Sequence, residues 1–193
     1  MSTPHEHFTI KTRTGMPLEA RLIDIRRRVL ATVESFENPI DDPIALIEEL
    51  PVGPQSTPSS VYALGLVHSA VRVGLYEAGV PVVMVMPSAL KRFATGKGNA
   101  KKSALGLELY KRTGLELGDD NQVDAYWLRA MGAHGLGEPF FDLPATHTSS
   151  DGWKAFLAAL GTAQKAYAER PSTRISPELL AKLDSDGSAD YHP

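Results

Sequence analysis

Carboxylates that could hold a metal ion stand at two places in the sequence. Glu48 and Glu49 end a short apolar run, and Asp120, Asn121 and Asp124 lie close together farther along the chain. On a helix, Asp120 and Asp124 share one face, where like charges cost a few tenths of a kcal/mol unless a cation lies between them. Oxygen ligands in a chain without cysteine favour Mg²⁺ or Mn²⁺ over Zn²⁺. The alternative is that "GDDN" is only a helix N-cap, because acidic residues suit a helix start.

The segment from Pro87 to Arg112 is strongly basic. It holds seven of the chain's 20 Lys and Arg residues but only one of its 23 Asp and Glu residues, Glu108. A local positive charge on an acidic chain favours contact with a polyanion such as nucleic acid. The alternative is a lysine-rich turn that is simply exposed to water. The candidates for phosphate contact are Lys91, Arg92, Lys97, Asn99, Lys101 and Lys102.

The glycine-rich stretch "TGKGNAKKS" lies at the centre of this basic segment. A nucleotide-binding P-loop needs a glycine directly before the lysine of its Lys-Ser pair and a strand directly before the loop. Here Lys101 precedes Lys102, and nine residues separate Met86 from Gly96, so we expect no nucleotide cofactor. We instead predict a turn followed by a helix capped by Asn99. Backbone N–H groups at a helix start, together with lysines, make a site for phosphate.

Strands and helices alternate along the chain, which predicts an α/β fold with a mainly parallel sheet. β-branched, apolar runs predict the strands, and apolar residues at three- and four-residue spacing predict the helices. Glycines at positions 79 and 114 are expected to end two of the helices. The predicted strands are residues 7–13, 44–48 and 80–86, and the predicted helices are residues 18–33, 61–78, 100–113, 121 onward and 153–167.

Composition sets the broad class of the protein. The 193 residues suffice for one domain with a core and a tail. No apolar run is long enough for a membrane helix, so we expect no membrane partner. The lack of cysteine makes a cytoplasmic protein the simpler interpretation.

Taken in order, the acidic strand end, the basic glycine loop and the acidic helix resemble one known family. The paired motifs "ALKRFATGKGNAKKS" and "DDNQVDAYWL" are similar to those of RuvC-type Holliday junction resolvases, especially their phage relatives, over residues 7–131. The resemblance implies an RNase H-like mixed sheet flanked by helices, with a C-terminal helical extension. It divides the chain into a nuclease domain at 1–135, a loop and helix at 136–170 and a flexible tail at 171–193.

The resemblance also implies an activity and assigns roles to residues. The family consists of homodimeric, Mg²⁺-dependent endonucleases that cut Holliday junctions and other branched DNA in bacterial or phage-infected cells. Glu48 matches its strand glutamate, Asp124 matches the last aspartate of its acidic helix, and Asn121 replaces the first. The implied catalytic residues are Glu48, Asp120, Asp124 and Lys102. The implied metal ligands are Glu48, Asp120, Asn121 and Asp124. The implied DNA contacts are Lys91, Arg92, Lys97, Asn99 and Lys101.

One part of the family pattern has no counterpart. The family opens with a hairpin, "GhDxSLxxxG", that carries its first catalytic aspartate, and nothing in "MSTPHEHFTIKTR" matches it. We therefore expect the chain to lack its first strands and one metal ligand. Two functions stay open: a RuvC-like nuclease completed by a further segment, or an impaired or inactive remnant that binds branched DNA. A third is an RNase H-like nuclease of another specificity.

Overall fold

The structure is a computed structural model that describes residues 9–35, 43–50 and 57–168. Helices and strands alternate over the first half of this part of the chain and only helices follow, so the class is mixed α/β. The elements are α1 (Leu18–Ser35), β1 (Ala45–Glu48), α2 (Pro58–Glu77), β2 (Val82–Val85), α3 (Pro87–Thr95), α4 (Lys102–Thr113), α5 (Asp120–Gly135), the 3₁₀ helix η1 (Ala145–His147) and α6 (Asp151–Ala168).

The sheet of the described residues has only two strands, which pair in parallel. The register sets Ala45 opposite Val82 and Glu48 opposite Val85. We predicted a third strand at residues 7–13. This prediction is wrong for residues 9–13, which form no strand, whereas residues 7–8 lie outside the described part. Instead, the Thr9 side chain hydrogen-bonds to the Asp119 and Gln122 side chains at the start of α5.

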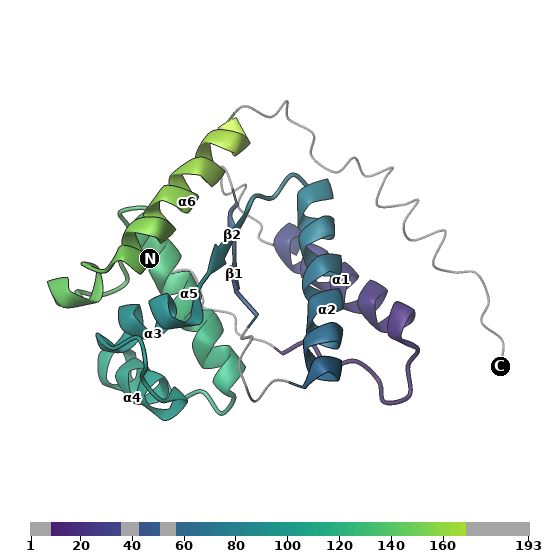
Figure 1. Cartoon of the computed structure of the whole chain (residues 1–193), viewed down its shortest axis with the longest axis horizontal. Helices are drawn as coiled ribbons and strands as arrows, with labels where there is room; N and C mark the ends of the chain where they lie inside the picture. The colour runs from purple at the N-terminus through teal and green to yellow at the C-terminus, as the bar shows by residue number, and fades with distance from the viewer. Residues whose placement is uncertain (1–8, 36–42, 51–56, 169–193) are drawn as a thin grey trace.

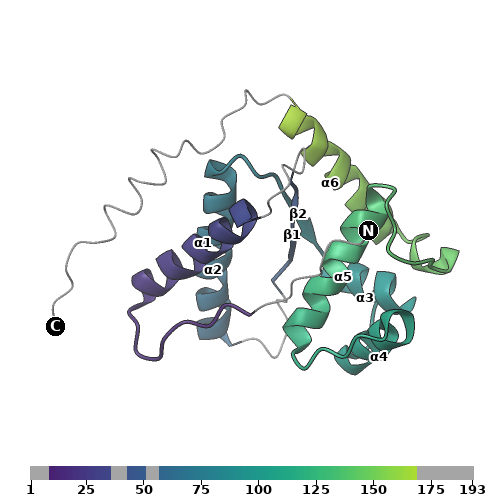
Figure 2. The same ribbon diagram turned by 180° about the vertical axis from the view of Figure 1, so that it is seen from behind.

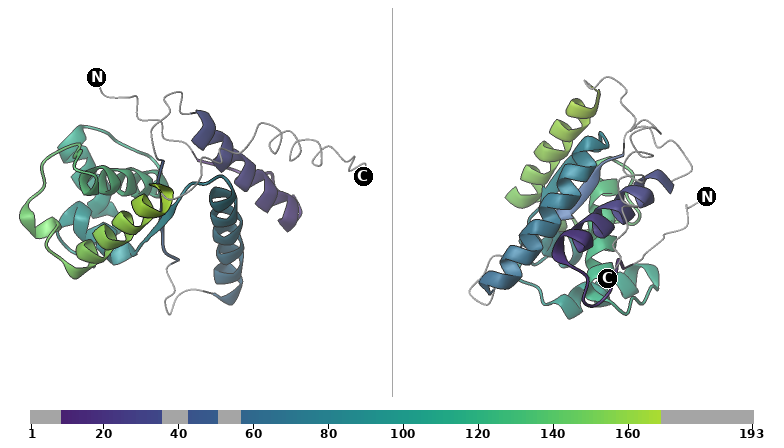
Figure 3. Two further views of the ribbon diagram at one scale, coloured as in Figure 1. Left: turned by 90° about the horizontal axis from the view of Figure 1, so that it is seen from above. Right: turned by 90° about the vertical axis from the view of Figure 1, so that its right-hand side faces the viewer.

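Helices cover both faces of this small sheet (Figures 1 and 2). Seen from above, α1 and α2 lie on one side of the strands and α3 to α6 on the other (Figure 3). Leu46 and Val85 belong to the core formed with α3 to α6, whereas Ile47 and Val82 pack in the core formed with α1 and α2. Since neighbouring side chains of a strand point to opposite faces, Glu48 follows Leu46 toward the α5 side.

The larger core is rich in aromatic side chains. Trp127 of α5 is fully buried, and its indole N–H donates to the Leu105 carbonyl of α4 at 3.1 Å. Phe93 of α3 stacks on Trp153 of α6, with ring centroids 5.5 Å apart. A buried aromatic side chain contributes about 1.5–3 kcal/mol through lost contact with water. These contacts bind α3, α4, α5 and α6 to one another, and thereby fix the elements that carry the candidate site.

The glycine loop differs from the sequence-based prediction at Asn99. The helix α4 begins at Lys102, with Lys101 as its N-cap residue and no side-chain cap, so the predicted cap at Asn99 is wrong. The reason is a tight turn in which the Ala100 N–H donates to the Lys97 carbonyl and Asn99 lies inside the turn. The helix α3 separates β2 from the loop, whereas in a P-loop the strand leads directly into the loop.

Other predictions hold or lie outside the described residues. Gly79 and Gly114 follow α2 and α4 with positive φ, which confirms them as helix stops. The predicted terminal helix is α6, whose Phe156 and Leu160 join the core of α3 to α5. The division into domains stays a prediction, and residues 169–193 are outside the described part.

Candidate nucleic-acid and metal site

Two carboxylates from distant parts of the sequence, Glu48 at the end of β1 and Asp124 on α5, lie within electrostatic range of each other. α5 packs against β1 at Gly132, where a Cβ atom would come within 3.2 Å of Leu46 Cδ2. A side chain at this position would therefore require the Leu46 side chain to shift by a few tenths of an ångström. Asp124 lies two turns earlier on α5, close enough to the strand end that its charge acts on Glu48. Glycine at position 132 thus helps to bring the two carboxylates together.

The pKa values of both carboxylates are raised. Burial raises the pKa of Glu48, and the negative charge of Asp124 raises this pKa further. Burial also raises the pKa of Asp124, and Asp120 adds to the rise. Each raised pKa means that the ionised form is disfavoured at the site. A bound cation would relieve both the desolvation and the repulsion.

Two lysines oppose these effects. Lys102 and Lys91 lower the pKa values of both carboxylates. Lys102 is the first residue of α4, and its Nζ lies 3.7 Å from Asp124 Oδ2. The Lys102 side chain is 56% exposed, whereas that of Asp124 is 15% exposed. The amine is therefore at the mouth of the site, where it can reach either the carboxylate or an anion from solution.

The remaining predicted metal ligands, Asp120 and Asn121, are both exposed at the start of α5. Asp119 caps this helix, because its Oδ1 accepts hydrogen bonds from the backbone N–H of Asn121 at 2.8 Å and from Asn121 Nδ2 at 2.9 Å. The Asn121 side chain is thus engaged in the cap. Within residues 9–35, 43–50 and 57–168, no three His, Cys, Asp or Glu side chains form a group that could hold a metal ion.

The predicted DNA-contact residues lie on α3 and in the glycine loop. Lys91 acts on the pKa values of both carboxylates, as described above. The other four side chains are exposed, and their contact with DNA stays a prediction. They are Arg92, Lys97, Asn99 and Lys101.

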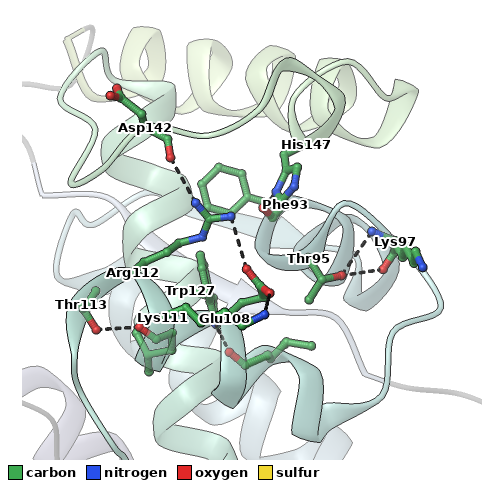
Figure 4. Close-up of polar contacts among 12 residues, drawn as sticks. Phe93, Thr95, Lys97, Glu108, Lys111, Arg112, Thr113, Trp127, Asp142 and His147 are labelled. Atoms are coloured by element: carbon green, nitrogen blue, oxygen red, sulfur yellow. Dashed lines mark hydrogen bonds and ion pairs between the residues drawn. The ribbon is translucent and has the colours of Figure 1, made fainter.

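Sequence reasoning missed His147, which it placed in an ordinary loop. Among the described residues, His147 is the polar residue that is buried, with 7% exposure. Its Nδ1 lies 2.8 Å from the Phe93 carbonyl oxygen (Figure 4). The only local signal was a histidine among prolines and threonines, which does not distinguish a buried side chain from an exposed one. His134, by contrast, packs edge-on against Phe93 and Trp153 in the aromatic core.

The donor set fits one divalent cation better than two. Mg²⁺ is commonly bound through one or two carboxylates, with water and substrate phosphate oxygens as the remaining ligands. Glu48 and Asp124 meet that requirement, and Asp120 is close enough to influence Asp124. A two-metal site would require more converging carboxylates than the described residues provide.

Among the described helices, none is both long and apolar enough to cross a lipid bilayer. No protein-family profile and no curated protein matches the sequence. Among solved structures, the chain is similar to the RuvC structure of Thermus thermophilus, with 26% sequence identity and a TM-score of 0.54. The match covers 67% of this chain and 76% of the Thermus chain. The comparison supports a RuvC-like fold, with the difference that the described sheet has two strands.

Proposed function

We propose that this protein is a RuvC-type endonuclease that hydrolyses phosphodiester bonds in Holliday junctions or other branched DNA, with Mg²⁺ or Mn²⁺ as cofactor. The observation that carries the proposal is the electrostatic coupling of Glu48 and Asp124 with each other and with Lys102 and Lys91, together with the ion pair between Lys102 and Asp124. The similarity to the Thermus RuvC structure supports the same class of activity. Neither a carboxylate pair nor a fold alone would suffice, because one fold serves many functions.

In this mechanism the carboxylates of Glu48 and Asp124 hold the cation, with Asp120 beside them. A bound Mg²⁺ supplies positive charge that lowers the pKa of a water molecule and stabilises the leaving 3′ oxygen. The Lys102 side chain is largely exposed, so it could turn from Asp124 toward a bound phosphate. Its amine would then donate to the scissile phosphate and stabilise the negative charge that develops there.

The neighbouring cations would position the DNA backbone. Lys91, Arg92, Lys97 and Lys101 lie on α3 and around the glycine loop. Contacts of this kind hold the register of a nucleic acid without reading its sequence. The start of α4 contributes backbone N–H groups that no side chain caps, and these also favour phosphate. Cleavage of both strands of a symmetric junction would require two copies, and we propose a homodimer.

A gel assay on a four-way junction tests the proposal. We expect metal-dependent cleavage by the full chain and its loss, by several powers of ten, in Glu48→Gln and Asp124→Asn, because a few kcal/mol of transition-state stabilisation changes the rate by such factors. Glu49→Gln is the matched control, since Glu49 follows directly after β1 and has no part in the pKa shift of either Glu48 or Asp124. Equal activity of Glu48→Gln and the wild type would overturn the assignment.

A second function, binding of branched DNA without cleavage, is favoured by one observation. Among the described residues, no group of three metal-binding side chains forms around Glu48 and Asp124. A site with too few ligands can still bind phosphate through its lysines. Salt-dependent junction binding without detectable cleavage, at protein concentrations that saturate the DNA, would select this second function.

A further inference from the structure

We propose that His147 is a positioning residue that holds the glycine loop, residues 96–101, in the shape needed to grip a DNA phosphate. The inference rests on the proposed DNA-binding function and adds to it a residue outside the carboxylate site. His147 belongs to η1, about fifty residues after the loop along the chain. It would act through the loop rather than by touching DNA.

The first observation is the fixed orientation of the imidazole ring. A carbonyl oxygen can only accept, so His147 Nδ1 carries the proton that it donates to the Phe93 oxygen at 2.8 Å. The ring is 7% exposed, and a buried polar group without this partner would be costly. Phe93 lies in the last turn of α3, directly before the loop. The hydrogen bond therefore attaches the His147 ring to α3, the helix that leads into the loop.

The second observation is the close approach of the same ring to Gly96. A Cβ atom at position 96 would lie 3.1 Å from His147 Nε2 and 3.3 Å from Cδ2. Gly96 also has φ of 78°, a conformation that suits glycine, and its N–H donates to the Arg92 carbonyl. Two independent requirements therefore select glycine here, and one of them is imposed by the histidine. The His147 ring therefore lies directly against the first residue of the loop, Gly96.

The third observation connects Gly96 to the lysines. The Thr95 hydroxyl can donate to the Lys91 carbonyl at 2.8 Å. Its Oγ1 accepts from the Lys97 N–H at 3.2 Å and lies 3.2 Å from the Lys97 carbonyl oxygen (Figure 4). The Ala100 N–H then donates to the Lys97 carbonyl at 3.2 Å, and α4 begins two residues later. A shift at Gly96 would therefore move Lys97 and the start of α4 together.

Gly98 restrains the loop from a second side. A Cβ atom there would lie 3.2 Å from the Ser88 carbonyl oxygen at the start of α3. The loop is thus held between the first turn of α3 and the His147 ring. Because Lys102 reaches Asp124 from the end of this loop, the ring indirectly sets where the amine meets the carboxylates. We expect loss of the ring to loosen the phosphate contacts without removing any charge.

Binding of a fluorescent four-way junction in EDTA, measured over a range of salt concentrations, tests this role. His147→Leu keeps the bulk but loses the donor, and we expect its salt dependence to fall by about one unit and its affinity to fall on the order of tenfold at about 0.1 M salt. His147→Asn retains an N–H donor near the position of Nδ1 and should recover most of the wild-type slope. His134→Leu is the matched control, because it removes the other histidine that packs on Phe93.

Hydrogen exchange of the loop amides gives a readout that does not depend on DNA. Faster exchange at residues 95–101 in His147→Leu, but not in His134→Leu, supports the role; equal exchange in both variants overturns it. A wild-type salt slope in a folded His147→Leu protein also overturns it, while leaving DNA binding intact. If the wild type itself shows no salt-dependent binding, the proposed function fails and loop exchange alone decides the role of His147.

A second variant covers the case in which His147→Leu does not fold. Gly96→Ala adds a Cβ atom against the ring and disfavours the positive φ, so the loop must shift. We expect the same loss of salt dependence in this variant. A slope equal to that of the wild type would show that the loop shape set by the ring does not matter for phosphate contact, and would overturn the proposal.

Discussion

The side-chain nitrogen of Lys102 lies 3.7 Å from Oδ2 of Asp124 and joins the start of α4 to the second turn of α5. This ion pair partly offsets the unfavourable charge on two half-buried carboxylates, because Lys102 lowers the pKa values of both Glu48 and Asp124. It connects the phosphate-binding side of the proposed site to its metal-binding side. Each part of this arrangement has a measurable consequence.

Removal of the Lys102 charge should raise the pKa values of both carboxylates. In Lys102→Met the lowering effect of the amine disappears, whereas burial and mutual repulsion continue to raise the pKa values. Carboxyl-detected NMR titration of the wild type and the variant measures the change. Lys97→Met is the control, since Lys97 is exposed in the loop and has no part in either pKa shift. Unchanged titration of Asp124 in Lys102→Met would contradict the ion pair.

Asp124→Asn should stabilise the protein at neutral pH. The folded-state pKa of Asp124 is raised, so the folded state binds a proton more readily than the unfolded state, and stability falls as the pH rises from the ordinary aspartate pKa through the folded value. The amide escapes this loss, and we expect a gain of about 0.5–2 kcal/mol, the range common for relief of unfavourable charge.

Denaturant unfolding at several pH values checks this gain. The difference between Asp124→Asn and the wild type should vanish at acid pH, where the carboxyl group is protonated in both states. Asp151→Asn is the control, because that side chain is 98% exposed and pairs only with Lys154 in the described contacts. A destabilised Asp124→Asn protein at neutral pH would contradict the unfavourable burial.

A divalent cation should stabilise the wild type but not the carboxylate variants. Binding to the folded state alone adds about 1.4 kcal/mol when the cation is at ten times its Kd. We expect Mg²⁺ or Mn²⁺ to raise the melting temperature of the wild type and of Glu49→Gln, and EDTA to reverse the effect. Glu48→Gln and Asp124→Asn should show little change. An equal rise in all four proteins would place the cation elsewhere.

The double variant Lys97→Ala, Lys101→Ala should bind branched DNA more weakly and with a flatter salt dependence. Each lost phosphate contact lowers the slope of log affinity against log salt by about 0.9. The loss should be similar for junctions of different sequence, because backbone contacts carry no sequence information. Lys154→Ala is the control, since it removes a lysine on α6 that pairs with Asp151. An unchanged slope would show that the loop is an ordinary solvated turn that makes no phosphate contact.

Gly132→Val should separate β1 from α5 and weaken the site. A Cβ atom at position 132 would lie 3.2 Å from Leu46 Cδ2, and the two methyl groups of valine need further room. Overpacking of this kind costs about 1–3 kcal/mol. Gly106→Ala is the matched helix control, because nothing lies within 4 Å of its added Cβ atom, and it should stabilise α4 by about 0.5–1 kcal/mol. Thermal unfolding of both variants measures the difference. A Gly132→Val protein as stable as the wild type would refute the close approach.

Local sequence patterns predicted most of the secondary structure. The apolar runs became β1 and β2, the periodic segments became helices, and Gly79 and Gly114 ended two of them. These features depend on interactions between near neighbours, such as backbone conformation and side-chain spacing, which a sequence displays directly. The acidic and basic candidates were also visible, because their residue types and order along the chain carry the resemblance to RuvC.

The tertiary structure alone decided which of those candidates meet. Thr9 hydrogen-bonds to Asp119 instead of continuing a strand, and Asn121 turns toward the helix cap. His147 reaches the carbonyl of Phe93, 54 residues away, and its ring meets Gly96. Such contacts join segments that are far apart along the chain, so they depend on how the cores pack and on which buried groups need partners. The sequence by itself determined the elements and the chemistry available, whereas packing of α5 on β1 decided that Glu48 and Asp124 act on each other.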